Sequence, residues 1–364
     1  MTVEPFVPPP YPYERLDEIT ARAAKHEGGA VDLSIGTPCD PSPPGVVDAL
    51  AVGDTSRGYP PSIGTPAYRT AVADWLARRF DVTIDPSTEV AAVVGSKEFV
   101  ASTPQYLRLR EPTRDTVLYP AISYPTYEMG ATLAGCRAVP YLSLDDITEQ
   151  DAQRALCIWV NSPANPTGEI HDLAVAAEWG RIRGIPVLSD ECYAEFTWDG
   201  PARSILQRGT EGVLALHSLS KRDNFAGARI GSYAGDASLV HYLREVRKHA
   251  GLMPAGPVQA AAVVALGDDA HVEVQRERYL RRMTVLSRLL TALDYDTTLP
   301  RGAFYLWVAA PDGDAWAAAR HIADRVGIVV SPGEFYGASS TGWFRVAAVQ
   351  PDERITLAAS RLAG

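Results

Sequence analysis

SLSKRDNFAGARIG, residues 218–231, overlaps the end of the apolar run GVLALHS (212–218), which predicts a buried strand. Lys221 therefore lies just beyond a strand end, and Arg229 follows eight positions later in a Gly-x-Arg-x-Gly setting. A lysine in this place can form a Schiff base with an aldehyde cofactor, while Ser218 and the fork of Arg229 can hold a phosphate. The alternative interpretation is a solvated Lys-Arg loop.

Helical stretches and short apolar stretches alternate from about residue 65 onward. Tyr68, Val72, Trp75 and Leu76 recur at helical spacing within Thr65–Phe80. Buried strands are expected at 89–95, 116–120, 155–160, 185–190, 212–218 and 229–234. Strands separated by helices favour an α/β fold with a mostly parallel central sheet covered on both faces.

The pattern changes after Gly235 and predicts a smaller α+β domain. Its expected helices are 238–249 and 271–293, and its expected strands are 303–309 and 342–349. The predicted division is an N-terminal arm with part of the small domain (1–44), a large cofactor-binding domain (45–240) and the small C-terminal domain (241–364). The Pro-rich arm at 5–12 is expected to lie extended over the surface.

Composition excludes several classes of function. The 364 residues are 46% hydrophobic, enough for a two-part globular enzyme. A net charge of −10 and an isoelectric point near 5.2 argue against nucleic-acid binding. The four cysteines form no CxxC pair or metal-ligand cluster, and no apolar stretch is long enough to cross a bilayer. A cytoplasmic protein with reduced thiols and no metal is expected.

Four further segments carry residues suited to a binding site. VVGSKEF (93–99) is a strand, a glycine and a helix start, which offers the free N–H groups of Gly95, Ser96 and Lys97 to a phosphate; Lys97 can equally be a surface lysine. LSDECY (188–193) ends a strand at Asp190, where open α/β sheets bind ligands. WFRVAAV (343–349) sets Arg345 among apolar residues, so Arg345 needs an anionic partner, either a ligand or an internal acid. NSPANPTG (161–168) is in isolation an ordinary turn.

Together, and in this order along the chain, these segments resemble the class I and II aminotransferases, which have pyridoxal 5′-phosphate (PLP) fold type I. The resemblance implies that Lys221 binds PLP and acts as the catalytic base, that Asp190 pairs with the pyridinium nitrogen, and that Asn165 and Tyr193 donate to the 3′-oxygen. It also implies that Tyr124 stacks on the cofactor ring and that Arg345 binds the substrate α-carboxylate. The implied phosphate-binding residues are Gly95, Ser96, Lys97, Ser218 and Arg229.

Two implications concern the pocket walls. LSIGTPCDPSPP (33–44) resembles the family's Gly-x-Pro stretch, in which backbone near Gly36 lines the substrate pocket. RGYPPSIGTPAYR (57–69) resembles a segment whose tyrosine, here Tyr59, reaches the phosphate in the neighbouring subunit. The implied assembly is a homodimer with shared active sites.

Taken over most of its length, the sequence most resembles the N-succinyldiaminopimelate aminotransferases of actinobacteria, which serve lysine and diaminopimelate biosynthesis. The implied substrates are N-succinyl-LL-2,6-diaminopimelate and 2-oxoglutarate, converted by ping-pong transamination. A substrate with negative charge at its far end requires a second cation in the pocket, and the candidates are Arg15, Arg22, Arg57 and Arg222.

Three alternatives remain open at this point. One is an aminotransferase for aspartate, an aromatic amino acid or kynurenine, and another is a PLP-dependent carbon–sulfur β-lyase. The third is a PLP-sensing module of a regulator, which the acidic charge and the absence of DNA-binding helices before the arm disfavour.

Overall fold

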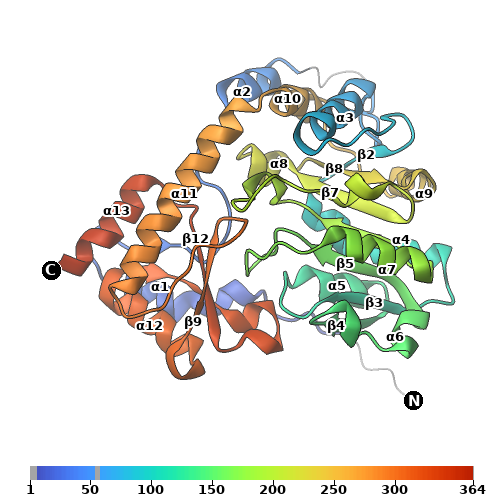
Figure 1. The fold of residues 1–364 in the computed structure, drawn as a ribbon. Coiled ribbons are helices and arrows are strands. Elements are labelled where there is room, and N and C mark those ends of the chain that lie inside the picture. The colour runs from blue at the N-terminus through green and yellow to red at the C-terminus, as the bar shows by residue number, and fades with distance from the viewer. Residues whose placement is uncertain (1–5, 54–57, 364) are drawn as a thin grey trace.

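The computed structural model describes residues 6–53 and 58–363. A seven-stranded sheet forms the centre of the larger part of the molecule (Figure 1). Only β8 runs antiparallel to its neighbours, so the carboxyl ends of the other six strands share one edge of the sheet. In spatial order the strands are β2 (Val90–Val93), β8 (Gly231–Gly235), β7 (Val213–Ser218), β6 (Val187–Asp190), β5 (Ala155–Asn161), β3 (Thr116–Pro120) and β4 (Arg137–Tyr141).

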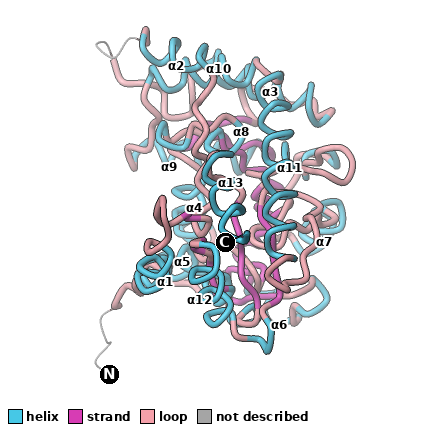
Figure 2. The backbone as a smooth tube through the Cα atoms, turned by 90° about the vertical axis from the view of Figure 1, so that its left-hand side faces the viewer, coloured by secondary structure: helices cyan, strands magenta, loops and turns pink. Residues whose placement is uncertain are grey.

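Helices cover both faces of this sheet, because its central strands are apolar on both sides. One face packs against α4 (Ser96–Arg110), α5 (Thr126–Leu133) and α9 (Ala237–His249). The other face packs against α3 (Pro66–Phe80), α7 (Leu173–Arg183) and α10 (Gly256–Gly267), with α2 (Pro44–Ala51) beside α10. Figure 2 shows the strands between these helices. The start of α3 is fixed by Thr65, whose side chain accepts a hydrogen bond from the Tyr68 N–H at 3.2 Å.

A second, smaller unit lies beside the sheet. Its antiparallel strands are β11 (Ser331–Pro332), β12 (Trp343–Ala347) and β9 (Tyr305–Ala309), and β1 (Val31–Asp32) pairs with β10 (Ile328–Val329). An apolar core joins these strands to the helices of the same unit. The helices of this unit are α1 (Asp17–Ala23), α11 (Ala270–Thr291), α12 (Ala315–Val326) and α13 (Asp352–Ser360). The long α11 connects the two parts of the molecule (Figure 1).

The expected α/β fold with a mostly parallel sheet and a smaller α+β unit is confirmed. The core of the large unit continues into α10, beyond the expected boundary at residue 240, because Ala261, Ala262 and Leu266 belong to that core and α10 packs against α3. The expected strand at 229–234 begins only at Gly231, since Arg229 has a left-handed φ of 55°. Within the described ranges no helix is long and apolar enough to span a membrane.

Candidate active site

A cavity of about 410 Å³ lies where the carboxyl ends of the parallel strands face the small unit. The topology explains why: Asp190 ends β6, Asn161 ends β5 and Ser218 ends β7. Residues expected from the sequence to form a site line this cavity together, although their segments are far apart in the chain. They are Gly36, Ser96, Lys97, Tyr124, Asn165, Asp190, Tyr193, Ser218, Lys221, Arg229 and Arg345.

Lys221 lies half-buried in the short helix α8 (Leu219–Arg222) that follows β7. Its Nζ donates a hydrogen bond to the carbonyl oxygen of Gly36. Burial lowers the pKa of Lys221 to about 8, with a further contribution from the positive charges of Arg345 and Arg229. A larger fraction of this amine is therefore unprotonated near neutral pH than for an ordinary lysine, as a nucleophile or base requires.

Asp190 is a buried carboxylate with two protein hydrogen bonds. The Tyr127 hydroxyl donates to Oδ2 at 2.8 Å, and the Cys192 N–H donates to Oδ1 at 3.2 Å. Burial raises the pKa of Asp190 despite hydrogen bonds from Cys192 and Tyr127. No cation of the described chain forms an ion pair with Asp190 within 4.0 Å. The carboxylate is thus suited to a positively charged ligand group in the cavity.

The opposite end of the cavity is suited to an anion. Gly95 caps the 15-residue helix α4 with a φ of 79°, and the Arg229 guanidinium lies so close that a Cβ on Gly95 would clash with it. Arg229 itself donates to the Ala226 carbonyl oxygen at 3.0 Å and has no acidic partner in the part of the chain described here. The free N–H groups at the start of α4, together with Arg229, form a site for a phosphate.

Arg345 is buried on β12 and is held by neutral groups. Its Nη1 donates to the Asn165 Oδ1 at 2.7 Å, and its Nη2 donates to the Ser34 carbonyl oxygen at 2.6 Å. The guanidinium lies 4.3 Å from the ring centre of Tyr305 and 4.8 Å from that of Tyr336. Its Nε is buried without a hydrogen-bond partner, and no described carboxylate lies within 4.0 Å. The internal salt bridge considered from the sequence is absent from these residues, which leaves Arg345 free to bind a carboxylate.

The tyrosines around the cavity were only partly anticipated. Tyr193 shares a hydrogen bond of 2.7 Å with Tyr305, and Tyr124 lies half-buried in the cavity wall. Tyr11 and Tyr13 of the N-terminal segment also line the cavity. This part of the chain therefore contributes to the cavity wall. The contact of Tyr127 with Asp190 was missed as well. The only sequence signal for it is its spacing three residues beyond Tyr124, at the start of α5.

One expected residue lies apart from the others. Tyr59 is 93% exposed and does not line the cavity of its own chain. Arg57, at the start of the same motif, falls outside the described residues. Among the other described candidates for a second cation, Arg15 pairs with Glu334 at 2.6 Å and Arg22 with Asp324 at 2.9 Å. Neither lines the cavity, so the expectation for these two arginines is wrong.

Together these groups match the three functional parts of PLP. The phosphate fits the Gly95–Arg229 end, the pyridinium nitrogen fits the unpaired carboxylate of Asp190, and the aldehyde carbon fits the amine of Lys221. The Asn165 side-chain nitrogen donates to no described residue, so it is available to the 3′-oxygen. The residues present therefore fit the cofactor.

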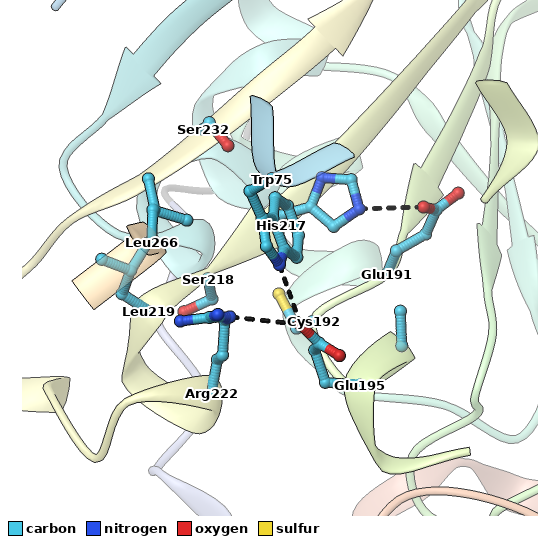
Figure 3. Close-up of a pocket in the computed structure, with 11 residues that line it drawn as sticks. Trp75, Glu191, Cys192, Glu195, His217, Ser218, Leu219, Arg222, Ser232 and Leu266 are labelled. Atoms are coloured by element: carbon cyan, nitrogen blue, oxygen red, sulfur yellow. Dashed lines mark hydrogen bonds and ion pairs between the residues drawn. The ribbon is translucent and has the colours of Figure 1, made fainter. Parts of the chain in front are cut away.

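Behind the site, a cluster of buried polar residues fixes the segment that carries Lys221 (Figure 3). Arg222 is the fourth candidate for a second cation, and its charge is already used: it pairs with Glu195 at 3.2 Å, Asp223 at 2.5 Å and Asp269 at 2.8 Å. His217 packs against Trp75, with 4.9 Å between the ring centres, and forms a pair with Glu191 at 2.9 Å. The void between these side chains is about 10 Å³, no larger than one water molecule needs. Arg222 therefore fixes the position of α8, the helix that carries Lys221, and does not bind the substrate.

Replacing Arg222 by methionine is expected to lower the free energy of unfolding by about 3 to 5 kcal/mol, because the buried Asp223 loses its arginine partner and Glu195 retains only Arg79. Denaturant unfolding at a fixed protein concentration measures the loss. Arg78→Met is the matched control, since Arg78 also pairs with Asp269 but its side chain is 41% exposed. That control should cost less than about 1 kcal/mol. Equal losses in the two variants would contradict the anchoring role.

Comparison with known proteins agrees with this geometry. The family model for class I and II aminotransferases matches residues 29–362. The 4-dedimethylamino-4-oxo-anhydrotetracycline transaminase OxyQ of Streptomyces rimosus is 42% identical, over 97% of this chain and 99% of the relative. The LL-diaminopimelate aminotransferase of Aquifex aeolicus is 35% identical over 97% of this chain and 96% of the relative. The structure of a probable N-succinyldiaminopimelate aminotransferase from Thermus thermophilus superposes with a TM-score of 0.84, at 29% identity, over 96% of this chain and 98% of that one.

Proposed function

The chain belongs to the class I and II aminotransferases, and on that premise we propose that it transfers the amino group of N-succinyl-LL-2,6-diaminopimelate to 2-oxoglutarate. As a member of this family it is a PLP-dependent enzyme that acts on amino acids and 2-oxoacids. The observation that carries the amino-transfer part of the proposal is the cavity that joins the amine of Lys221, the carboxylate of Asp190 and the buried guanidinium of Arg345. The choice of donor is supported by similarity to the Thermus thermophilus protein. Its place in metabolism would be lysine and diaminopimelate biosynthesis.

PLP, when bound, supplies an electron sink for the pair released at the substrate α-carbon. Asp190 keeps the ring nitrogen protonated, and Tyr127 fixes the orientation of that carboxylate through its hydrogen bond. Arg229, Ser218 and the first N–H groups of α4 hold the phosphate. Asn165 and Tyr193 would donate to the 3′-oxygen, and Tyr124 would stack on the ring.

Arg345 binds the α-carboxylate of the substrate with both arms of its fork, and thereby orients the α-carbon toward Lys221. The free amine of Lys221 would take the proton from the substrate α-carbon and would return a proton to that carbon when the reaction runs in reverse with the oxoacid. A pKa of about 8 suits both steps, because the amine exchanges protons readily near neutral pH. The two substrates bind in turn at one site, so the kinetics are ping-pong.

The relatives support two choices of amino donor. The Thermus thermophilus neighbour carries the name of a probable N-succinyldiaminopimelate aminotransferase, and several curated relatives at 31% to 35% identity are named LL-diaminopimelate aminotransferases. LL-diaminopimelate without the succinyl group is therefore the second candidate donor. The tetracycline transaminase is named for a bulky 4-oxo compound, so a ketone of that class belongs in the test panel as an alternative amino acceptor.

A homodimer with shared active sites is part of the proposal. Tyr59 is 93% exposed, which leaves it available to a second copy of the chain. In that arrangement its hydroxyl reaches the cofactor phosphate of the partner subunit. Mixing a Lys221→Ala chain with a Tyr59→Phe chain would test this directly, because a shared site regains one intact copy in the mixed dimer.

The donor is tested by single half-reactions. The visible absorbance of the protein-bound cofactor is recorded before and after addition of each donor, and again after 2-oxoglutarate. Loss of the band with N-succinyl-LL-2,6-diaminopimelate, its return with 2-oxoglutarate and the formation of glutamate are expected. A separate assay with an S-substituted cysteine tests the lyase alternative: release of a thiol, pyruvate and ammonia without an oxoacid would identify a β-lyase.

A response to LL-diaminopimelate alone would transfer the assignment to the second candidate. A response only to aspartate, an aromatic amino acid or kynurenine would retain the aminotransferase and overturn the proposed donor. Absence of a visible band after reconstitution with PLP would overturn the whole proposal.

A further inference from the structure

The first turn of α4, at the phosphate end of the cavity, contains an acidic side chain. Gly95 caps this helix, and Glu98 is its third residue. A carboxylate in the first turn of a helix interacts with the same N–H groups and the same positive dipole end that attract a phosphate. A phosphate ester is close to doubly charged at neutral pH. An unpaired Glu98 would therefore oppose the binding of the cofactor phosphate.

Glu98 is instead paired with an arginine from a distant part of the chain. Arg247, on α9, donates from Nη1 to Oε1 at 2.9 Å and from Nη2 to Oε2 at 2.6 Å. Its side chain is 2% exposed, and that of Glu98 is 23% exposed. Within the described ranges neither group has another ionic partner. Because this two-pronged contact is largely shielded from water, it neutralises Glu98 more completely than a surface pair would.

The same guanidinium also packs behind the first two turns of α4. It lies 5.3 Å from the ring centre of Phe99 and 5.9 Å from that of Tyr233, and these two rings stack with 4.7 Å between their centres. Ser102 donates to Glu98 Oε1 at 2.7 Å and accepts from Arg247 Nη1 at 3.4 Å. One side chain of α9 thus holds the start of α4 in place from outside the cavity, since none of these residues lines it.

We propose that Arg247 is a positioning residue for the cofactor phosphate. It neutralises Glu98 and fixes the start of α4, so that the N–H groups there meet a phosphate without a competing charge. Its action is indirect, because Arg247 does not line the cavity. The inference rests on the proposed function in one respect, the placement of the phosphate at the start of α4, and it holds for any amino donor.

The first test compares PLP with pyridoxal, which has the same ring and aldehyde but no phosphate. Bound and free cofactor are separated by ultrafiltration of the loaded enzyme, which yields a Kd for each. Arg247→Met should weaken PLP binding by roughly 5- to 10-fold and change pyridoxal binding by less than about twofold. Glu98→Gln alone should bind PLP at least as well as the wild type. The double variant should recover PLP affinity to within about twofold of the wild type, because the opposing charge is gone.

The second test measures the charge of the bound phosphate by phosphorus NMR of the loaded enzyme. A free phosphate ester takes up its second proton near about pH 6. The cavity cations should keep the wild-type phosphate dianionic between about pH 6 and 8. In Arg247→Met the unpaired carboxylate of Glu98 should raise the pKa of the phosphate, so that its resonance shifts with pH in this range. Lys97, Asp190, Lys221 and Arg229 line the cavity in every variant, so the double variant should titrate like the wild type.

Two further variants of α9 serve as controls. Arg244→Met removes the same charge from the same helix, but Arg244 pairs with Glu245 at 3.5 Å and forms no ion pair with the described residues of α4. It should leave PLP affinity and the phosphate titration unaltered. Arg247→Lys keeps the charge and should retain most of the PLP affinity. If Arg247→Met does not fold, Arg247→Gln, which can still donate to Glu98, should show the same loss for PLP relative to pyridoxal.

The outcomes separate this inference from the function on which it rests. Equal weakening of PLP and pyridoxal in Arg247→Met, or no recovery in the double variant, would overturn the positioning role and leave the phosphate site intact. An equal loss in Arg244→Met would also overturn it, because the effect would then come from overall charge. If the wild type bound PLP no better than pyridoxal, the phosphate site at the start of α4 would itself be overturned.

Discussion

Lys221→Ala is expected to lower kcat for amino transfer by at least about 10⁴-fold, because it removes both the covalent anchor of the cofactor and the base that moves the α-proton. The spectrum of the PLP-loaded variant should lack the visible band of the wild type. A direct readout is borohydride reduction of the wild-type protein followed by peptide mapping. The chain has four lysines, Lys25, Lys97, Lys221 and Lys248, and the reduced pyridoxyl group should be found on Lys221 alone.

Lys221→Arg separates the chemistry of the amine from its charge. Arginine retains a cation next to Gly36 but does not form the Schiff base at neutral pH, so this variant should be as inactive as Lys221→Ala. Lys25→Ala, a change at an exposed lysine, should keep both the band and the activity. A pyridoxyl group on Lys97, or a Lys221→Ala protein with substantial amino transfer, would contradict the assignment.

The fold was predictable because the elements that build it have strong local patterns. Thr65–Phe80 combines a capping threonine, a proline in the first turn and apolar residues at helical spacing, and the helix was found at Pro66–Phe80. The buried strands β3, β5 and β7 are continuous apolar runs and were located to within one residue at each end. Two elements lacked such signals. The edge strand β4 contains a proline and is mostly part-exposed, and α10 is apolar almost all round, so its spacing indicates no face.

The main chemical groups of the site were predictable for a topological reason. Asp190 and Ser218 each end a parallel strand, and parallel strands bring such residues to one edge whatever their separation in the sequence. The resemblance to a known family then suggested a role for each of them.

Contacts between segments that are far apart in the chain could not be predicted from the sequence in this way. Arg15 pairs with Glu334, and Arg222 with Asp269, so arginines that look available in the sequence have no free charge in the fold. Lys97 is a second example: its motif suggests that the backbone N–H binds a phosphate, but nothing near Lys97 in the sequence indicates which groups its side chain contacts. Its place between Tyr11 and Tyr124 depends on the N-terminal segment folding back to the cavity mouth.

Arg345→Met is expected to lower kcat/KM for amino acid donors by about 10²- to 10³-fold, because the loss of one partner of a buried charge pair costs roughly 2 to 5 kcal/mol. The effect should be specific for the α-carboxylate. Wild-type enzyme should therefore favour glutamate strongly over 4-aminobutyrate, which has the same far carboxylate and no carboxylate at the reacting carbon. In Arg345→Met that preference should largely disappear.

Two measurements distinguish this role from a structural one. The visible cofactor band should persist in Arg345→Met, since Arg345 contacts Asn165 and Ser34 and does not belong to the phosphate end of the cavity. Arg345→Lys keeps the charge and loses the fork, so it should recover only part of the preference for glutamate. If Arg345→Met lowered the rates with glutamate and 4-aminobutyrate by the same factor, the role of the guanidinium would be structural only. It would stabilise β12 by packing against the rings of Tyr305 and Tyr336. The α-carboxylate would then have to bind another cation of the cavity.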